Sequence, residues 1–108
     1  MAKIEIIPGT LDMLVLRVLS GGATHGWGIA QRIHLLSREV LKVEEGSLYP
    51  ALYRMEQKGW IGSEWGQSEN NRKAKFYSLT KKGRKQLEAE RENWDQLVGA
   101  IRQVMTSA

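Results

Sequence analysis

The last quarter of this chain places the strongest constraint on its fold. From residue 81 onward apolar side chains recur at helical spacing, and Thr80 stands where it can cap the start of a helix. The pattern predicts one helix from Lys81 to about Met105, roughly 37 Å long at about 1.5 Å per residue. A chain of 108 residues is too small to cover a helix of that length. The helix is therefore expected to leave part of an apolar stripe uncovered, which consists of Trp94, Leu97, Val98, Ile101, Val104 and Met105.

The first helix carries a similar signal. It is expected to run from Thr10, as the N-cap, to about Leu19, and the pair Gly21-Gly22 ends it. One face consists of Leu11, Leu14, Val15, Val18 and Leu19, while Met13 and Leu16 lie on the back. A helix that is apolar on both sides is expected to be buried on both sides. A domain this small can hardly arrange that alone, so the first and last helices together predict a homodimer.

Two further helices are expected between them. The second spans roughly Trp27 to Arg38, and its inward residues are Ile29, Ala30, Ile33 and either Leu36 or Leu35. The third starts near Ser47, which can cap it, and ends at Gly59. Pro50 then falls in the first turn, where its missing N–H leaves no hydrogen bond unmade. The apolar spacing turns three residues of this helix toward the core, namely Leu48, Leu52 and Met55.

A hairpin is expected before the last helix. Residues 60–67 and 74–79 have the character of strands, and the polar loop from Ser68 to Arg72 joins them. Its two asparagines, Asn70 and Asn71, tolerate left-handed backbone. Three helices, a hairpin and a long helix, in that order, are typical of a winged helix-turn-helix. We therefore predict a mainly α (α+β) fold, with a winged helix-turn-helix DNA-binding domain over residues 1–80 and a C-terminal dimerisation helix over 81–108 in the same compact unit.

Composition excludes several classes of function. The chain has no cysteine, so it can form neither a disulfide nor a thiolate metal site. Its longest strongly apolar run, residues 13–16, is far too short for a membrane span or an export signal, so we expect a soluble cytoplasmic protein. His25 and His34 have no carboxylates at ligand spacing, and each is expected to be structural. No phosphate-binding loop or nucleophile–base pattern occurs, which predicts a protein without cofactor, metal or enzymatic activity.

Positive charge is concentrated at and after the predicted wing. The net charge is +4, and no acid interrupts the run of Arg72, Lys73, Lys75, Lys81, Lys82, Arg84 and Lys85. A solvated charged hairpin is the simpler interpretation of any such run. The absence of acids and the position opposite the helix-turn-helix favour contact with phosphates or with the minor groove by Arg72, Lys73 and Lys75.

The face of the third helix that points away from the core is expected to contact DNA. A recognition helix reaches base edges with its N-terminal residues, while arginine and hydroxyl groups also hold phosphates. The residues of this face are Ser47, Tyr49, Pro50, Tyr53 and Arg54. The alternative is that they are ordinary surface and half-buried residues, and Tyr49 in particular could pack under the second helix.

Four motifs of the chain resemble those of the PadR family of bacterial transcriptional regulators. They are Pro8-Gly9-Thr10-Leu11-Asp12, His25-Gly26-Trp27-Gly28-Ile29, Glu45-Gly46-Ser47-Leu48-Tyr49-Pro50-Ala51-Leu52 and Lys75-Phe76-Tyr77-Ser78-Leu79-Thr80. They recur in that order and spacing over about residues 8 to 87, and the single-helix tail resembles the smaller of the family's two size classes. The departures are Trp27 and Phe76, which stand where tyrosines are more usual.

The resemblance implies a homodimer that binds a palindromic operator in double-stranded DNA, usually as a repressor released by a small molecule. The first and last helices would hold the dimer through Leu11, Leu14, Val15, Val18, Trp94, Leu97, Ile101 and Val104. Some short members stack a flat ligand in a central interface cavity, and a small aromatic effector would here meet Trp94, Leu97, Val98 and Ile101. Two alternatives stay open. One is a winged-helix module for protein–protein interaction, against which the basic wing argues, and the other is a ligand sensor in which DNA binding is secondary.

Overall fold

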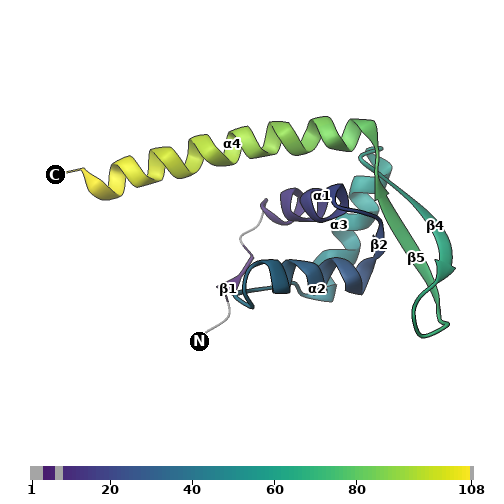
Figure 1. Ribbon diagram of the computed structural model, residues 1–108. Coiled ribbons are helices and arrows are strands. Elements are labelled where there is room, and N and C mark those ends of the chain that lie inside the picture. The colour runs from purple at the N-terminus through teal and green to yellow at the C-terminus, as the bar shows by residue number, and fades with distance from the viewer. Residues whose placement is uncertain (1–3, 7–8, 108) are drawn as a thin grey trace.

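The computed structural model describes residues 4–6 and 9–107. In these parts of the chain four helices pack around one core, and a hairpin projects from it (Figure 1). The helices are α1 (Leu11–Ser20), α2 (Gly26–Leu36), α3 (Glu45–Gln57) and α4 (Lys81–Thr106). The predicted order of three helices, a hairpin and a long helix is confirmed, and so is the mixed α+β class.

The hairpin is formed by β4 (Ile61–Gln67) and β5 (Lys73–Leu79). The two strands pair antiparallel, and Trp65 stands opposite Lys75. In the turn between them Asn71 adopts the left-handed conformation, with φ 58°, that its side chain tolerates better than most. Both strands agree with the predicted ranges to within one residue, because their alternation and the polar turn are local signals.

Three very short strands were not predicted. β2 (Thr24–His25) pairs antiparallel with β5, so the sheet has the order β2-β5-β4. β1 (Ile4–Glu5) and β3 (Leu41–Lys42) pair in parallel with each other. Strands of two residues show no alternation that a sequence pattern could detect.

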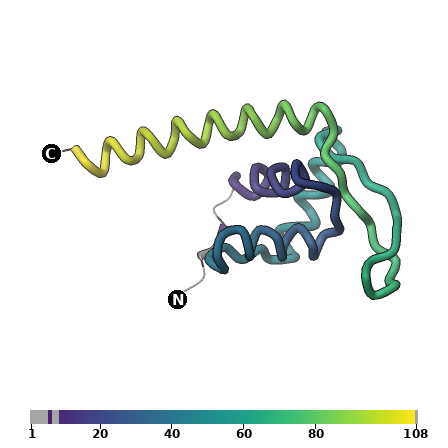
Figure 2. Tube along the Cα trace, in the orientation of Figure 1, coloured from purple at the N-terminus to yellow at the C-terminus, as the bar shows by residue number. Residues whose placement is uncertain are grey.

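Helix α1 lies between α2 and α4 (Figure 2) and also contacts α3 and β5. Val15 and Leu16, which belong to the front and the back of the predicted amphipathic helix, are both fully buried within this one chain. The expectation that the back of α1 needs a second copy is therefore wrong for Leu16, since its own chain buries it completely. The rest of the core includes Val18, Leu19, Ile29, Ile33, Leu48, Leu52, Met55, Ile61, Tyr77 and Leu87.

Helix α2 ends two residues earlier than predicted. The backbone turns left-handed at Arg38 and Glu39, which have φ values of 55° and 66°. Leu35 and Leu36 therefore lie in the final turn of α2, where both are exposed. The prediction that one of these two leucines faces inward is wrong, while Ile29 and Ile33 are buried as expected.

Helix α3 begins earlier than predicted. The carbonyl of Glu44 accepts hydrogen bonds from the N–H groups of Ser47 and Leu48, both at 3.0 Å, so Glu44 is the N-cap. The assignment of the cap to Ser47 is therefore wrong, and Pro50 lies in the second turn instead of the first. Its missing N–H leaves the carbonyl of Gly46 without a helical donor. That loss is tolerable because Gly46 is exposed to water.

Helix α4 confirms the strongest sequence prediction. Thr80 Oγ1 accepts a hydrogen bond from the N–H of Gly83 at 3.0 Å and so caps the helix. The helix has 26 residues, which corresponds to a length of about 39 Å. A Cβ on Gly83 would collide with the carbonyl of Trp60, so glycine lets α4 dock onto the base of the hairpin. The C-terminal half of α4 extends past the other helices, at the opposite end from the hairpin (Figure 1).

Candidate nucleic-acid interface

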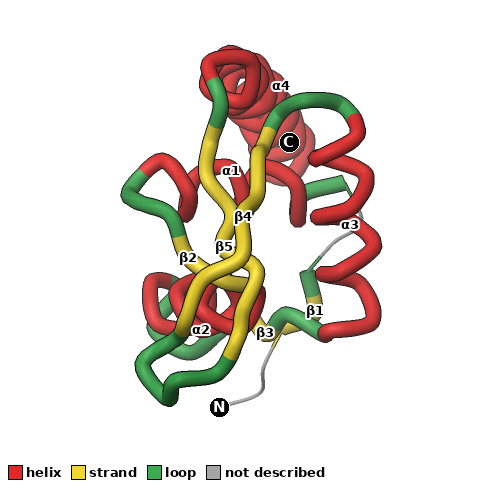
Figure 3. Tube along the Cα trace, turned by 90° about the vertical axis from the view of Figure 1, so that its right-hand side faces the viewer, coloured by secondary structure: helices red, strands yellow, loops and turns green. Residues whose placement is uncertain are grey.

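Figure 3 shows the hairpin in front of the helices, with α3 to its right. Ser63 Oγ of β4 donates a hydrogen bond to Glu56 Oε2 of α3 at 2.6 Å, and Lys75 Nζ of β5 lies 3.3 Å from Glu56 Oε1. The hydrogen bond from Ser63, followed by the contacts of Lys75, lowers the pKa of the Glu56 carboxyl, which burial alone would raise. These contacts turn the hairpin face that carries Ser63 and Lys75 toward α3.

Two tyrosines lie on α3 away from α1. Tyr53 is 67% exposed. The ring of Tyr49 packs against Gly26 at the start of α2, where a Cβ would lie 2.5 Å from the tyrosine hydroxyl oxygen. Burial, and secondarily the charge of Glu45, raises the pKa of the Tyr49 hydroxyl. The alternative in which Tyr49 packs against the second helix therefore describes its position, although part of the ring remains exposed.

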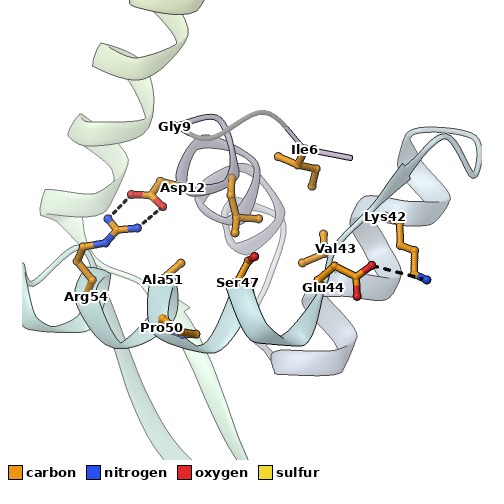
Figure 4. Close-up of a pocket in the computed structure, with 11 residues that line it drawn as sticks. Ile6, Gly9, Asp12, Lys42, Val43, Glu44, Ser47, Pro50, Ala51 and Arg54 are labelled. Carbon is orange, nitrogen blue, oxygen red and sulfur yellow. Dashed lines mark hydrogen bonds and ion pairs between the residues drawn. The ribbon is translucent and has the colours of Figure 1, made fainter. Parts of the chain in front are cut away.

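Ser47 and Pro50 are exposed on the side of α3 that faces the start of α1. With Asp12 and Arg54 they line a cleft of about 900 Å³ between α1 and α3 (Figure 4). The five residues predicted to face DNA are thus divided between two sides of α3. Ser47, Pro50 and Arg54 line the cleft, and Tyr49 and Tyr53 lie on the side away from it.

Arg54 reaches back to α1 instead of extending into solvent. Its Nη1 donates to Asp12 Oδ2 at 2.5 Å, and its Nη2 donates to Asp12 Oδ1 at 2.8 Å. This hydrogen-bonded pair is the main reason that the pKa of the Arg54 guanidinium is raised. Contact of Arg54 with DNA stays a prediction, but both of its terminal nitrogens are engaged within the chain.

The cations of the wing are less isolated than the sequence run suggests. Arg72 and Lys73 are exposed at the turn, and Lys73 Nζ lies 5.4 Å from the centre of the Trp65 ring. Glu64 in β4 and Glu69 in the turn are also exposed on the hairpin. The acid-free run along β5 therefore does not describe the charge of the folded wing, because β4 and the turn each carry an exposed glutamate.

Trp65 is a candidate contact residue that sequence reasoning did not select. It is 63% exposed, and it shares a face of the hairpin with its cross-strand partner Lys75. Because β-strand side chains alternate, Ser63 lies on the same face, which turns toward α3. A signal for it existed, since Trp65 stands four residues beyond Ile61, the core residue of β4, on the part of the strand that approaches the turn.

His25 has a structural role, as predicted. Its Nδ1 accepts a hydrogen bond from a backbone N–H in the first turn of α2 at 3.0 Å, and its ring stacks on Trp27 at 3.5 Å. The ring also meets Phe76 of β5 edge-on at 5.3 Å, and its Nε2 lies 3.9 Å from Glu69 Oε1 in the wing turn. The buried His25 therefore ties the start of α2 to the wing. His34 lies 3.1 Å, through its Nδ1, from a backbone carbonyl of β3.

On α4, Trp94, Leu97 and Ile101 line a groove of about 450 Å³ together with Met13 of α1 and Glu90 of α4. Trp94 is half-buried, whereas Leu97 and Ile101 are more than half exposed. The structure thus brings three of the four residues predicted for a flat ligand to one groove. Val98, the fourth, is half-buried and is not among the residues that line it.

The residues predicted for a dimer interface fall into two groups. Val15 and Val18 belong to the core of the single chain and leave almost no surface for a partner. The others keep exposed or half-buried surface, and they are Leu11, Leu14, Trp94, Leu97, Ile101 and Val104.

Two helices are joined by a short connection, a hairpin packs beside the second of them, and that helix and the hairpin both carry exposed side chains. These features define a winged helix-turn-helix protein of the DNA-binding class. No helix in the described ranges is long and apolar enough to cross a membrane. The model of the transcriptional regulator PadR-like family matches residues 15–89. The chain belongs to this family, whose members are transcriptional regulators and not enzymes.

Solved structures agree with this assignment. A transcriptional regulator from Clostridium thermocellum superposes with a TM-score of 0.80 at 27% identity, over 88% of this chain and 92% of that one. A PadR-like transcriptional regulator from Bacillus cereus gives a TM-score of 0.77 at 26% identity, over 93% and 95%. A PadR family transcription regulator from Clostridium difficile gives 0.75 at 30% identity, over 90% and 99%.

Proposed function

We propose that this PadR-like regulator is a homodimeric repressor that binds a palindromic operator in cytoplasmic DNA and is released by a small-molecule effector. The observation that carries the proposal is the C-terminal half of α4. It extends beyond the body of the protomer and exposes a continuous apolar stripe, which consists of Leu97, Ile101, Val104 and Met105. An apolar stripe of this kind is typical of a surface that a partner covers, and a second copy is the simplest partner.

Around a two-fold axis, the two α4 helices would pack along this stripe. Leu11, Leu14 and Trp94 have half-buried surface beside it and would join the contact, while Val15 and Val18 would support α1 from the core. The symmetric pair of α3 helices would then enter successive major grooves, about 34 Å apart.

Contacts with DNA would come from α3 and the wing. Ser47 and Pro50 would reach base edges, because the N-terminal segment of a recognition helix enters the groove first, and Tyr53 with the exposed part of Tyr49 would contact DNA from the other side of α3. Arg72 and Lys73 are exposed at the wing and would meet phosphates, and Lys75 would do so while it also pairs with Glu56.

The effector would be a flat aromatic molecule in the groove beside Trp94. Two-fold symmetry would duplicate this tryptophan, and paired aromatic faces can stack a planar ligand. Gly99 supports close approach at this part of α4, because a Cβ there would meet nothing of its own chain within 4 Å. A mid-helix glycine costs about 1 kcal/mol relative to alanine, so a glycine that its own fold does not require suggests an incoming backbone or ligand.

Selection of binding sites from random duplex DNA tests the proposal. The expected result is a palindrome with half-sites about one helical turn apart, together with a dimeric mass by light scattering. A folded chain that enriches no duplex would contradict DNA binding and favour a protein-interaction module. Calorimetric titration of planar aromatic compounds into wild type and Trp94→Phe tests the effector site. Tight ligand binding without sequence preference on DNA would favour a sensor instead.

A further inference from the structure

The ion pair between Arg54 and Asp12 joins the recognition helix to α1, and the two residues are 42 positions apart in the chain. Both terminal nitrogens of the guanidinium donate to both oxygens of the carboxylate, in the fork geometry that makes such pairs strong (Figure 4). The side chain of Asp12 is only 14% exposed, whereas that of Arg54 is 47% exposed. The carboxylate is thus held largely out of water and depends on Arg54 for its hydrogen bonds.

A third charged residue connects this pair to α4. Glu90 lies near enough that its charge contributes to raising the pKa of Arg54. Burial raises the pKa of Glu90 itself, and the charge of Asp12 adds to that effect while Arg54 opposes it. Among the described residues, Glu90 Oε2 is buried without a hydrogen-bond partner. Asp12, Arg54 and Glu90 therefore form one charged cluster, to which α1, α3 and α4 each contribute a residue.

This geometry conflicts with a role of Arg54 in contacting bases. An arginine recognises guanine with the same two-pronged arrangement of N–H groups that Asp12 already occupies. To reach DNA, Arg54 would have to leave a carboxylate that is largely shielded from water, and an unpaired buried carboxylate is costly.

We infer that Arg54 is a positioning residue, which clamps the recognition helix to α1 through Asp12 and does not contact DNA. The inference rests on the proposed DNA-binding function and corrects one residue of the predicted contact surface. Operator binding would need the clamp because the clamp sets the orientation of α3 relative to α1 and α4, the helices proposed to hold the dimer.

The same cluster borders the groove beside Trp94. Glu90 lines that groove together with Met13, one residue along α1 from Asp12. A molecule that separates α1 from α4 would therefore move Glu90 away from the Asp12–Arg54 pair and change the charge that surrounds the clamp. The groove is thus linked to α3 by the electrostatic effect of Glu90 on Arg54, and by the hydrogen-bonded pair of Arg54 with Asp12.

A double-mutant cycle on operator binding distinguishes a clamp from a DNA contact. The four proteins are wild type, Arg54→Ala, Asp12→Asn and the double variant, each titrated with operator and random duplex over a range of salt concentrations. For a clamp, each single variant loses operator affinity about tenfold, and the double variant loses no more than either, because the partners act as one unit. The log–log salt slope stays that of wild type, since no phosphate contact is removed.

The outcomes that overturn the inference are equally specific. If Arg54 contacts phosphate, Arg54→Ala flattens the slope by about one. If it reads a base, Asp12→Asn leaves operator affinity unchanged or raises it, because the arginine is released. Losses that add in the double variant also overturn the clamp. A wild-type chain that binds no duplex overturns the proposed function, and this inference with it.

Controls separate the clamp from general destabilisation. Ser20→Ala removes the exposed hydrogen bond from Arg17 Nη1, at 3.1 Å, within α1, and it should leave operator affinity and discrimination unchanged. Melting curves report whether each variant is folded at the assay temperature. If Arg54→Ala unfolds, Arg54→Lys takes its place in the cycle. A lysine keeps the charge but loses the fork, so a clamp predicts an intermediate loss of operator affinity with an unchanged slope.

Discussion

Replacing Ile101 by aspartate should break the proposed dimer while the protomer stays folded. Ile101 lies in the C-terminal half of α4, and 52% of it is exposed. Substitutions at such exposed positions usually change the stability of the protomer little. Self-association and folding can therefore be separated at this residue.

The magnitude follows from the surface still available for burial. Fully burying an isoleucine side chain contributes about 1.5–3 kcal/mol. Since about half of Ile101 is already covered in the protomer, covering the rest contributes about 1 kcal/mol per copy and about 2 kcal/mol per dimer. At about 1.4 kcal/mol for each factor of ten, the dissociation constant should rise roughly 30-fold. This is a lower limit, because aspartate also brings a charge into an apolar contact.

Sedimentation equilibrium over a concentration series measures this change, and Leu35→Asp is the matched control. Leu35 is 57% exposed but lies at the end of α2, outside the stripe. We expect Ile101→Asp to dissociate at concentrations where wild type and Leu35→Asp are dimers, with melting temperatures of the isolated protomers unchanged. If Ile101→Asp associates as wild type does, α4 does not form the interface.

Three further predictions concern the wing and the charged cluster. Arg72→Ala combined with Lys73→Ala should flatten the salt slope by about 1 to 2 and weaken operator and random duplex alike, and an unchanged slope would mean that the wing points elsewhere. Trp65→Ala should weaken DNA binding at least fivefold, roughly 1 kcal/mol for the loss of buried aromatic surface, and unchanged affinity in binding titrations would remove Trp65 from the interface. Glu90→Gln should raise the melting temperature at neutral pH. Folding raises the pKa of Glu90, so the folded chain holds that proton more tightly, and stability is lost as the pH rises through the raised value. The gain should vanish below the ordinary glutamate pKa, and a gain independent of pH would contradict this.

The elements of the fold that were predicted well are those with local signals. The cap at Thr80 and the alternation of the wing strands need no knowledge of the rest of the chain, and both appear in the structure. The start of α3 was misplaced because Ser47 is a residue type that often caps helices. The cap is Glu44, whose backbone carbonyl accepts the first helical bonds without any help from its side chain.

Predictions about what covers a helix were less successful. The two apolar sides of α1 suggested a partner chain, but Val15 and Leu16 are both buried by elements of the same chain. An apolar pattern shows how much of a helix needs cover and not which element provides it. Leu35 and Leu36 fit an inward pattern equally well and are exposed, because left-handed residues end α2 just after them.

Long-range electrostatics could not be predicted from the sequence. Arg54 has the position and chemistry of a DNA-contacting residue on α3, and nothing near it in the chain points to Asp12. Likewise, the uninterrupted cations of β5 and the residues after it gave no sign that Glu56 of α3 would pair with Lys75. Charges acquire partners only when the chain folds.

The central claim is that two copies of this chain bind DNA together, with α3 helices in successive major grooves. The most direct test compares the selected palindrome with the same sequence after about five base pairs, half a helical turn, are inserted between its half-sites. We predict two chains per duplex on the palindrome and at least about a hundredfold loss of affinity on the lengthened site, because the second α3 would then face the wrong side of the duplex. Equal affinity for both duplexes, or one chain per duplex, would contradict the account.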